Sequence, residues 1–206
     1  LYNIQRCVRT IDIDEVGDNK HLTCFEMVGN WSLGDFTKAE QIPWILELHV
    51  ERYGFDPSRL YISVWGGDDS IPRDDEAIEL WKKAFRKYGI EAEYSEDTSN
   101  LPKDTEEGKT WKPRIFPFGK KANWWQRGPD VAGELGGPSS EIFFDTGKIV
   151  HEQEKYDIND DSWRFLEIGN NVFMEYRFGE NGKWEKLPKK NIDFGGGFDR
   201  LVRCIQ

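Results

Sequence analysis

Cysteine is scarce in this chain of 206 residues, which holds only Cys7, Cys24 and Cys204. An odd number of widely spaced cysteines without a C-x-x-C pair argues against a disulfide framework and against a structural zinc site. The sequence therefore favours a protein of the reducing cytoplasm.

Long hydrophobic runs are also missing. No apolar segment approaches the length of a membrane span, and the N-terminus has no charged region followed by an apolar signal core. We therefore expect no membrane partner. The chain begins without methionine, in a segment typical of a strand, and its last helix runs to Gln206. We expect residues 1–206 to be one domain, truncated at both ends.

An excess of positive charge is the third absence. Lys and Arg number 28 against 38 Asp and Glu, which gives a net charge of −10. No summed basic field attracts nucleic acid to such a chain, so a nucleic-acid partner requires a local patch or sequence outside these residues. What is abundant is apolar: 37 % of the residues are hydrophobic, with nine Trp and thirteen Phe, enough for one sizeable core.

The apolar residues follow the two-residue period of strands in some segments and the helical period of about 3.6 residues in others. Strands are expected at residues 21–28, 60–65, 141–145 and about 165–178, the last followed by a hairpin turn at 180–182. One helix is expected over the apolar positions from Ile42 to Leu48, and another from Asp74 to Gly89. The apolar stripe of the second helix consists of Ala77, Ile78, Trp81, Ala84, Phe85 and Tyr88. Residues 95–121, polar and rich in Lys, Thr and Pro, are expected to form a long loop. We expect a mixed α/β fold with a largely antiparallel sheet.

Three successive glycines at 195–197 precede the helix that begins with "FDRLV". Bare backbone at a helix N-terminus favours an anion, and Arg200, one turn into the helix, adds a cation that fits phosphate oxygens. A glycine turn with a surface arginine is an equally good interpretation of this stretch alone. Asp193 would repel an anion, so it fits better as the partner of a cation. A ligand with both an ammonium group and a phosphate would satisfy both features.

Five segments in order resemble one family. The run "QRCVR…DEVG…HLTCFEMVGNWSLGDF" resembles motif 2 of the class II aminoacyl-tRNA synthetases, in the form found in alanyl-tRNA synthetases. The segments "ANWWQRG", "GGPSSEIFFDTG", "NNVFMEY" and "LPKKNIDFGGGFDRL" follow, and the last resembles motif 3. The resemblance extends from about Ile4 to Leu201. It implies the fold of a class II catalytic core, an antiparallel sheet flanked by helices.

The resemblance also implies roles for individual residues. Arg9 matches the arginine that grips the α-phosphate of ATP, Arg200 the arginine near the γ-phosphate, and Phe25 the aromatic residue that covers adenine. The other positions implied at the ATP site are Glu26, Met27, Gly196 and Gly197. The pocket for alanine is implied to consist of Trp125, Asn170, Val172, Asp193 and Gly195. Asp193 matches the carboxylate that holds the ammonium group.

The implied reaction joins alanine and ATP into alanyl-adenylate, with release of pyrophosphate and later transfer to tRNA(Ala) through regions mostly outside this chain. The enzyme would be an alanine-tRNA ligase that uses ATP and Mg²⁺. Candidate magnesium ligands are Glu141, Asp145 and Asp199, although their spacing does not prove the assignment.

The chain departs from the family at several places. Gly169 stands where the family usually has tryptophan, and the short "TIDIDEVG" stands where many members carry a longer loop with a lysine. Two alternatives stay open: a module repurposed to activate an amino acid for an acceptor other than tRNA, and a non-catalytic interaction module. The joint presence of Arg9, Asp193 and Arg200 argues against the second.

Overall fold

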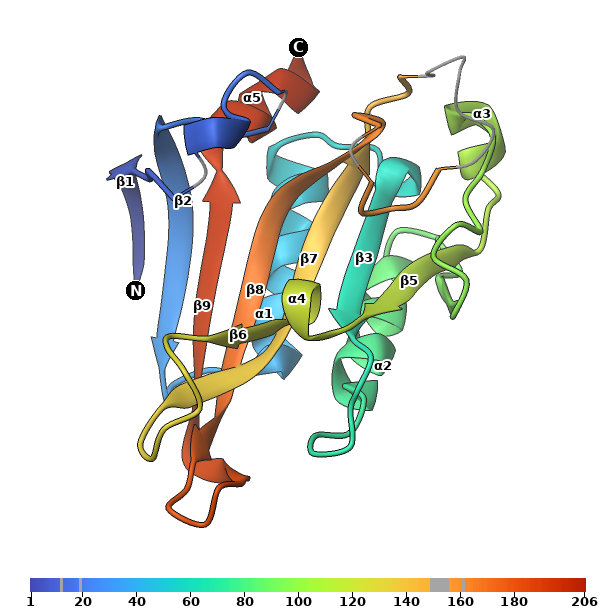
Figure 1. Cartoon of the computed structure of the whole chain (residues 1–206). Helices are drawn as coiled ribbons and strands as arrows, with labels where there is room; N and C mark the ends of the chain where they lie inside the picture. The colour runs from blue at the N-terminus through green and yellow to red at the C-terminus, as the bar shows by residue number, and fades with distance from the viewer. Residues whose placement is uncertain (12, 19, 149–155, 161) are drawn as a thin grey trace.

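One large sheet dominates the computed structural model, which describes residues 1–11, 13–18, 20–148, 156–160 and 162–206 (Figure 1). In these residues the sheet has nine strands in the order β1-β2-β9-β8-β7-β3-β5-β4, and β6 pairs with β7. The strands are β1 (Tyr2–Val8), β2 (Cys24–Leu33), β3 (Leu60–Trp65), β4 (Glu93–Tyr94), β5 (Pro113–Phe118), β6 (Trp124–Gln126), β7 (Leu135–Asp145), β8 (Phe165–Phe178) and β9 (Trp184–Gly197). Only the β3–β5 and β4–β5 pairings of this described sheet are parallel. The expected largely antiparallel sheet is confirmed.

The helices are mostly short. They are α1 (Lys38–Glu47), α2 (Asp75–Arg86), α3 (Thr105–Gly108), α4 (Lys120–Asn123) and α5 (Phe198–Ile205), with 3₁₀ turns at Ile13–Glu15 and Pro57–Arg59 and a π turn at Leu48–Arg52. α1 begins with a capping box in which Thr37 accepts from the Ala39 N–H and the Glu40 carboxylate accepts from the Thr37 N–H. α2 begins at the cap Asp74, which also binds the buried Lys38 ammonium group at 2.7 Å. No helix among the described residues is long and apolar enough to cross a membrane.

The main core lies between the sheet and the pair α1 and α2, which cover the same face (Figure 1). The predicted stripe of α2 is buried there from Ala77 to Phe85, while Tyr88 is partly buried at its end. β3 is buried on both faces, because Leu60, Ile62 and Val64 face the helices and Tyr61 and Trp65 belong to clusters on the opposite face.

The expected loop at residues 95–121 is wrong in part. It contains α3, strand β5 and the start of α4. Proline is disfavoured inside a strand, and "PRIFPF" contains two. Nevertheless Ile115 and Phe116 are fully buried, and the buried Arg114 donates to the carbonyl oxygens of Ser58 and Gly108. Tertiary burial therefore outweighs the local turn composition. The strands predicted at 60–65 and 165–178 are confirmed, whereas β7 begins before the predicted segment, at Leu135, and β2 continues to Leu33.

Candidate active site

A cavity of about 350 Å³ opens on the face of the sheet away from α1 and α2. Its walls come from the β1–β2 connection and from β2, β6, β8, β9 and α5. The lining residues that the sequence predicted are Arg9, Phe25, Met27, Trp125, Asn170, Val172, Asp193, Gly195, Gly197, Asp199 and Arg200. Four of the five segments that resemble the family therefore contribute to one cavity, although they lie far apart in the chain; the segment 136–147 contributes no lining residue.

The strand period selects which residues of β2 and β9 face the cavity. Side chains alternate between the two faces, so Asp193, Gly195 and Gly197 share one face and Phe194 and Gly196 the other. Met27 lies opposite Gly197 in the β2–β9 register, and its Sδ lies 2.7 Å from where a Cβ of Gly195 would stand. Gly195 therefore admits the thioether across the floor of the cavity.

A bulge in β8 adds a residue that simple alternation would exclude. Glu167 and Asn170 are three positions apart and would point to opposite faces of a regular strand, yet both line the cavity. The register with β7 shifts between Ile142, which pairs with Gly169, and Phe143, which pairs with Glu167. The irregularity turns both side chains toward the same space.

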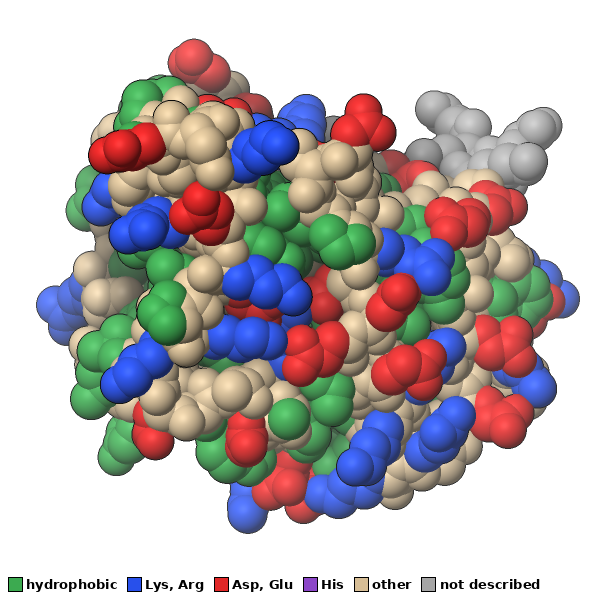
Figure 2. All heavy atoms as spheres, turned by 90° about the horizontal axis from the view of Figure 1, so that it is seen from below, with side chains coloured by type: hydrophobic (Ala, Val, Ile, Leu, Met, Phe, Trp, Pro, Cys, Tyr) green, Lys and Arg blue, Asp and Glu red, His purple; other side chains and the backbone are tan. Residues whose placement is uncertain are grey.

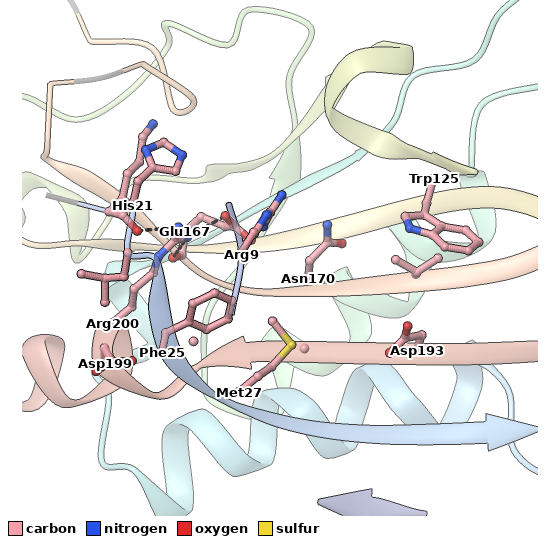
Figure 3. Close-up of a pocket in the computed structure, with 15 residues that line it drawn as sticks. Arg9, His21, Phe25, Met27, Trp125, Glu167, Asn170, Asp193, Asp199 and Arg200 are labelled. Carbon is pink, nitrogen blue, oxygen red and sulfur yellow. Dashed lines mark hydrogen bonds and ion pairs between the residues drawn. The ribbon is translucent and has the colours of Figure 1, made fainter. Parts of the chain in front are cut away.

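Basic groups gather at one end of the cavity. Figure 3 shows Arg9, His21 and Arg200 at this end, around Glu167. Arg200 donates from Nη1 to the Glu167 carboxylate at 2.7 Å and to the Glu167 carbonyl oxygen at 2.9 Å, and from Nη2 to the Lys20 carbonyl oxygen at 3.0 Å. Three acceptors thus fix the guanidinium group in place.

The loop that carries Lys20 and His21 is held by Asp18. Its carboxylate accepts from the backbone N–H groups of Lys20 and His21 and contacts His21 Nδ1 at 2.6 Å. Burial opposes ionisation, but these hydrogen bonds outweigh it and lower the pKa of Asp18 to about 2. The loop therefore keeps an ionised anchor at neutral pH.

Asp193 lies at the other end, beside Trp125 (Figure 3). Val172 stands directly opposite Asp193 in the β8–β9 register. Burial raises the pKa of Asp193, and a hydrogen bond with the Trp31 side chain opposes this rise. A half-buried carboxylate with an apolar wall suits a small ligand that carries a positive charge.

Two residues predicted for the ATP site do not line the cavity. The Glu26 carboxylate lies 3.8 Å from Arg6 Nε, and its backbone N–H donates to Asp199 Oδ2 at 3.2 Å. Gly196 faces the core, where its Cβ would lie 3.2 Å from the carbonyl oxygen of Ile168. Side chains alternate along a strand. The residues before and after Glu26, and those before and after Gly196, line the cavity, so Glu26 and Gly196 themselves point to the other face.

The three predicted magnesium ligands are not brought together. Asp145 forms a buried ion pair with Arg164 at 3.0 Å, and Asp199 accepts from the Glu26 N–H. Within the described ranges, no group of three or more His, Cys, Asp or Glu side chains is arranged to hold a metal ion. Asp145 does not fit the role, because it is fully buried in its pair with Arg164 and does not line the cavity.

Glu141 fits better, together with a residue that the sequence did not single out. Burial, and secondly the charge of Glu167, raise the pKa of Glu141 to about 8, while a hydrogen bond from Ser63 and the charges of Arg200 and Lys20 act in the opposite direction. Glu141 does not line the cavity, but the repulsion between its carboxylate and that of Glu167 would be relieved by a divalent cation. The donor chemistry of Glu141 and Glu167 therefore fits Mg²⁺.

Sequence reasoning missed four lining residues: Lys20, His21, Leu22 and Glu167. The first three follow one another in "DNKHL", where His21 and Leu22 begin the strand predicted at 21–28, so their place in the motif 2 segment was a usable signal. The sequence contains no comparable signal for Glu167, because the orientation of its side chain depends on the bulge in β8.

Similarity to known proteins identifies the family of this chain. The family described as "tRNA synthetases class II (A)" matches residues 1–93 and 88–206. The alanine–tRNA ligase of Borrelia hermsii is 40 % identical over 100 % of this chain and 30 % of its own length, and that of Petrotoga mobilis is 40 % identical over 98 % of this chain and 20 % of its own. A cytoplasmic alanine–tRNA ligase of Caenorhabditis elegans is 37 % identical over 99 % of this chain and 19 % of its length.

A solved structure of apo histidyl-tRNA synthetase from S. aureus aligns with a TM-score of 0.42 and 16 % identity, covering 89 % of this chain and 40 % of that one. The present chain spans less than a third of the length of the curated relatives named above. The family match extends along the whole chain, and four of the five segments that resemble the family line one cavity. The chain therefore belongs to the alanyl-tRNA synthetase family of class II synthetases.

Proposed function

We propose that this chain is the catalytic core of an alanine-tRNA ligase and forms alanyl-adenylate from alanine and ATP. The observation that carries the proposal is the polarity of the cavity, with Asp193 at one end and Arg9 and Arg200 at the other. Alanine presents an ammonium group and ATP a polyphosphate, so the two substrates match the two ends.

The small end of the cavity would bind alanine. Asp193 would hold the ammonium group, and Trp125 and Val172 would leave room for little more than a methyl group. Asn170, the neighbour of Gly195 in the β8–β9 register, would add a polar contact. The substrate carboxylate would then point toward the basic end, where the phosphates lie.

The reaction needs no protein nucleophile. A carboxylate oxygen of alanine forms a bond with the α-phosphorus, and the bond from that phosphorus to the pyrophosphate oxygen breaks, so pyrophosphate leaves with the electron pair. Arg9 would stabilise the charge on the α-phosphate in the transition state, and Arg200 would bind the outer phosphates. Phe25 would cover the adenine ring.

Magnesium would supply charge neutralisation on the phosphates when it is bound. Glu141 and Glu167 are the residues that would hold it. Burial, and secondly the repulsion between their carboxylates, raise the pKa of Glu141, and a divalent cation would relieve that repulsion.

Transfer to tRNA(Ala) would complete the function of the whole protein. Figure 2 shows basic and acidic side chains intermixed on the face seen there, with no uniform basic field. This agrees with the net charge of −10 and with recognition of tRNA mainly by regions outside this chain. The cytoplasm is the proposed location, as in the name of the Caenorhabditis elegans relative.

Pyrophosphate exchange with each amino acid tests the proposal in the full-length protein. We expect alanine-dependent exchange, and we expect Arg9→Ala to lower its rate by about 100-fold or more, because a lost transition-state contact of this kind is worth roughly 3 kcal/mol. Arg6→Ala is the matched control, since the Arg6 side chain, on the strand β1 that precedes Arg9, is 93 % exposed. Equal rates in the folded Arg9 variant and the control would refute the assignment. Exchange without charging of tRNA would indicate another acceptor.

A further inference from the structure

Trp31 stands directly opposite Asp193 where β2 pairs with β9. Side chains that face each other in an antiparallel pair have Cβ atoms only about 5 Å apart, so they contact each other. Trp31 does not line the cavity, whereas Asp193 does. The indole is therefore placed behind the carboxylate, on the side away from Val172.

Gly29 fixes the direction in which the indole lies. A Cβ on Gly29 would be 3.0 Å from Cζ2 and Cη2 of Trp31, so the ring extends along β2 over the bare backbone of Gly29. Gly29 in turn pairs with Gly195, the cavity residue next to Asp193 on the same face. Because Cζ2 and Nε1 are attached to the same ring carbon, the edge that lies over Gly29 is the edge that carries the N–H donor.

We propose that Trp31 is a positioning residue for the amino-acid site: its indole N–H donates to Asp193 and fixes the carboxylate for the substrate ammonium group. This inference rests on the proposed function of Asp193. Within the described part of the chain, Trp31 is the only side chain whose hydrogen bond to Asp193 opposes the effect of burial on that carboxylate's pKa. Before alanine binds, one neutral donor thus offsets part of the effect of burial on this carboxylate.

The donor opposes the rise in the pKa of Asp193 that burial causes, and it does so without a resident cation. A lysine or arginine at this position would compete with the ammonium group of alanine, because it would satisfy the carboxylate fully. An indole N–H stabilises the negative charge without neutralising it. The indole has no hydrogen-bond acceptor, so its N–H edge does not compete with Asp193 for the hydrogen bonds of the ammonium group.

Trp31→Phe removes the donor and keeps most of the aromatic packing. We expect the pKa of Asp193 to rise in this variant. Consequently, on the acid limb of the pH profile the KM for alanine exceeds that of the wild type by about tenfold, since hydrogen bonds to charged groups are worth more than 1 kcal/mol. On the alkaline plateau the difference is smaller. The kcat and the KM for ATP stay near wild type, because the phosphate end is untouched.

Trp44→Phe is the matched control, since Trp44 is 51 % exposed on α1 and does not line the cavity. A purely structural role of Trp31 would change the unfolding midpoint but would leave the shape of the pH profile unaltered, and that result would overturn the inference. Asp193→Asn separates this failure from failure of the proposed function. If it leaves the KM for alanine unchanged, the ammonium site is wrong; if it raises the KM while Trp31→Phe leaves the profile unshifted, only the role of Trp31 is wrong.

Discussion

Arg200 joins α5 to β8 through Glu167, whose carboxylate lies 2.7 Å from Arg200 Nη1 and whose carbonyl oxygen lies 2.9 Å from the same nitrogen. The contact places a carboxylate charge close enough to Glu141 to contribute to its raised pKa. Glu167 is therefore linked both to the guanidinium group proposed for phosphate binding and to the carboxylate proposed for magnesium.

Glu167→Gln should lower the pKa of Glu141 from its value of about 8, because the variant removes a negative charge that favours the protonated form. Burial is the larger cause of the shift, so the pKa of Glu141 should remain above its usual value of 4.5. Carboxyl-carbon NMR titration measures the change. Glu91→Gln, an exposed change beside Lys112, is the control that should leave this titration unaltered. An unmoved Glu141 titration in Glu167→Gln would contradict the coupling.

The amino-acid pocket should discriminate weakly between alanine and other small amino acids. Trp125 and Val172 can exclude large side chains, but no wall excludes glycine, and one missing methyl group is worth only about 1 to 3 kcal/mol. Serine adds one hydroxyl to alanine, which a mainly apolar pocket rejects weakly. We therefore expect measurable pyrophosphate exchange with glycine and with serine in the full-length protein.

Val172→Ala should relax this size limit further, because Val172 is buried beside Asp193 on the opposite strand. Exchange with serine and with larger amino acids should rise relative to alanine. Val131→Ala, which changes a 53 % exposed valine, should leave the ratios as they are. Identical ratios in both variants would show that Val172 does not form the wall.

Acid should destabilise the fold through His49. This side chain is 1 % exposed, and burial lowers its pKa from 6.5 to about 4, although a hydrogen bond with the Ile45 carbonyl oxygen opposes the shift. Below pH 6.5 the unfolded chain binds a proton that the folded chain excludes, so the free energy of unfolding falls as the pH drops from 6.5 toward 4. The loss should reach about 3 kcal/mol. It is absent above pH 6.5.

Urea unfolding at several pH values in this range measures the effect. His49→Phe should flatten this part of the profile, whatever its effect on stability at neutral pH, because the titrating group is gone. Equal slopes in the variant and the wild type would assign the acid sensitivity to other groups.

The space beside Gly169 is occupied by the ring of Phe194. A Cβ at this position would lie 2.8 Å from Cε2 of Phe194, whose ring is 3 % exposed and packs near the His49 ring. Gly169→Ala should therefore lower the free energy of unfolding by about 1 to 3 kcal/mol through overpacking. Gly119→Ala is the control, since no atom lies within 4 Å of its Cβ position.

The double variant Gly169→Ala with Phe194→Leu should lose less stability than the sum of the two single changes, because the smaller side chain makes room for the new methyl group. Denaturant midpoints of the four proteins give this coupling. Strict additivity would show that the Phe194 ring does not occupy the space in front of Gly169.

Much of the candidate site could be predicted from the sequence because its parts lie on short segments whose local geometry is regular. Asp193, Gly195 and Gly197 are two residues apart, and the period of a strand places them on one face wherever that strand lies. The same period put Gly196 and Glu26 outside the cavity, a distinction that the family resemblance alone did not make.

Other features depend on contacts between distant segments, which no local pattern encodes. Residues 113–118 form a strand because Ile115 and Phe116 become buried when β5 pairs with β3, in spite of the prolines. Glu167 reaches the cavity only because the β7–β8 register shifts beside it. Trp31 meets Asp193 only because β2 pairs with β9 in one particular register. Sequence periodicity determines the face on which a side chain lies, but register is decided by the packing of whole strands against one another, and register chose the neighbours of Asp193.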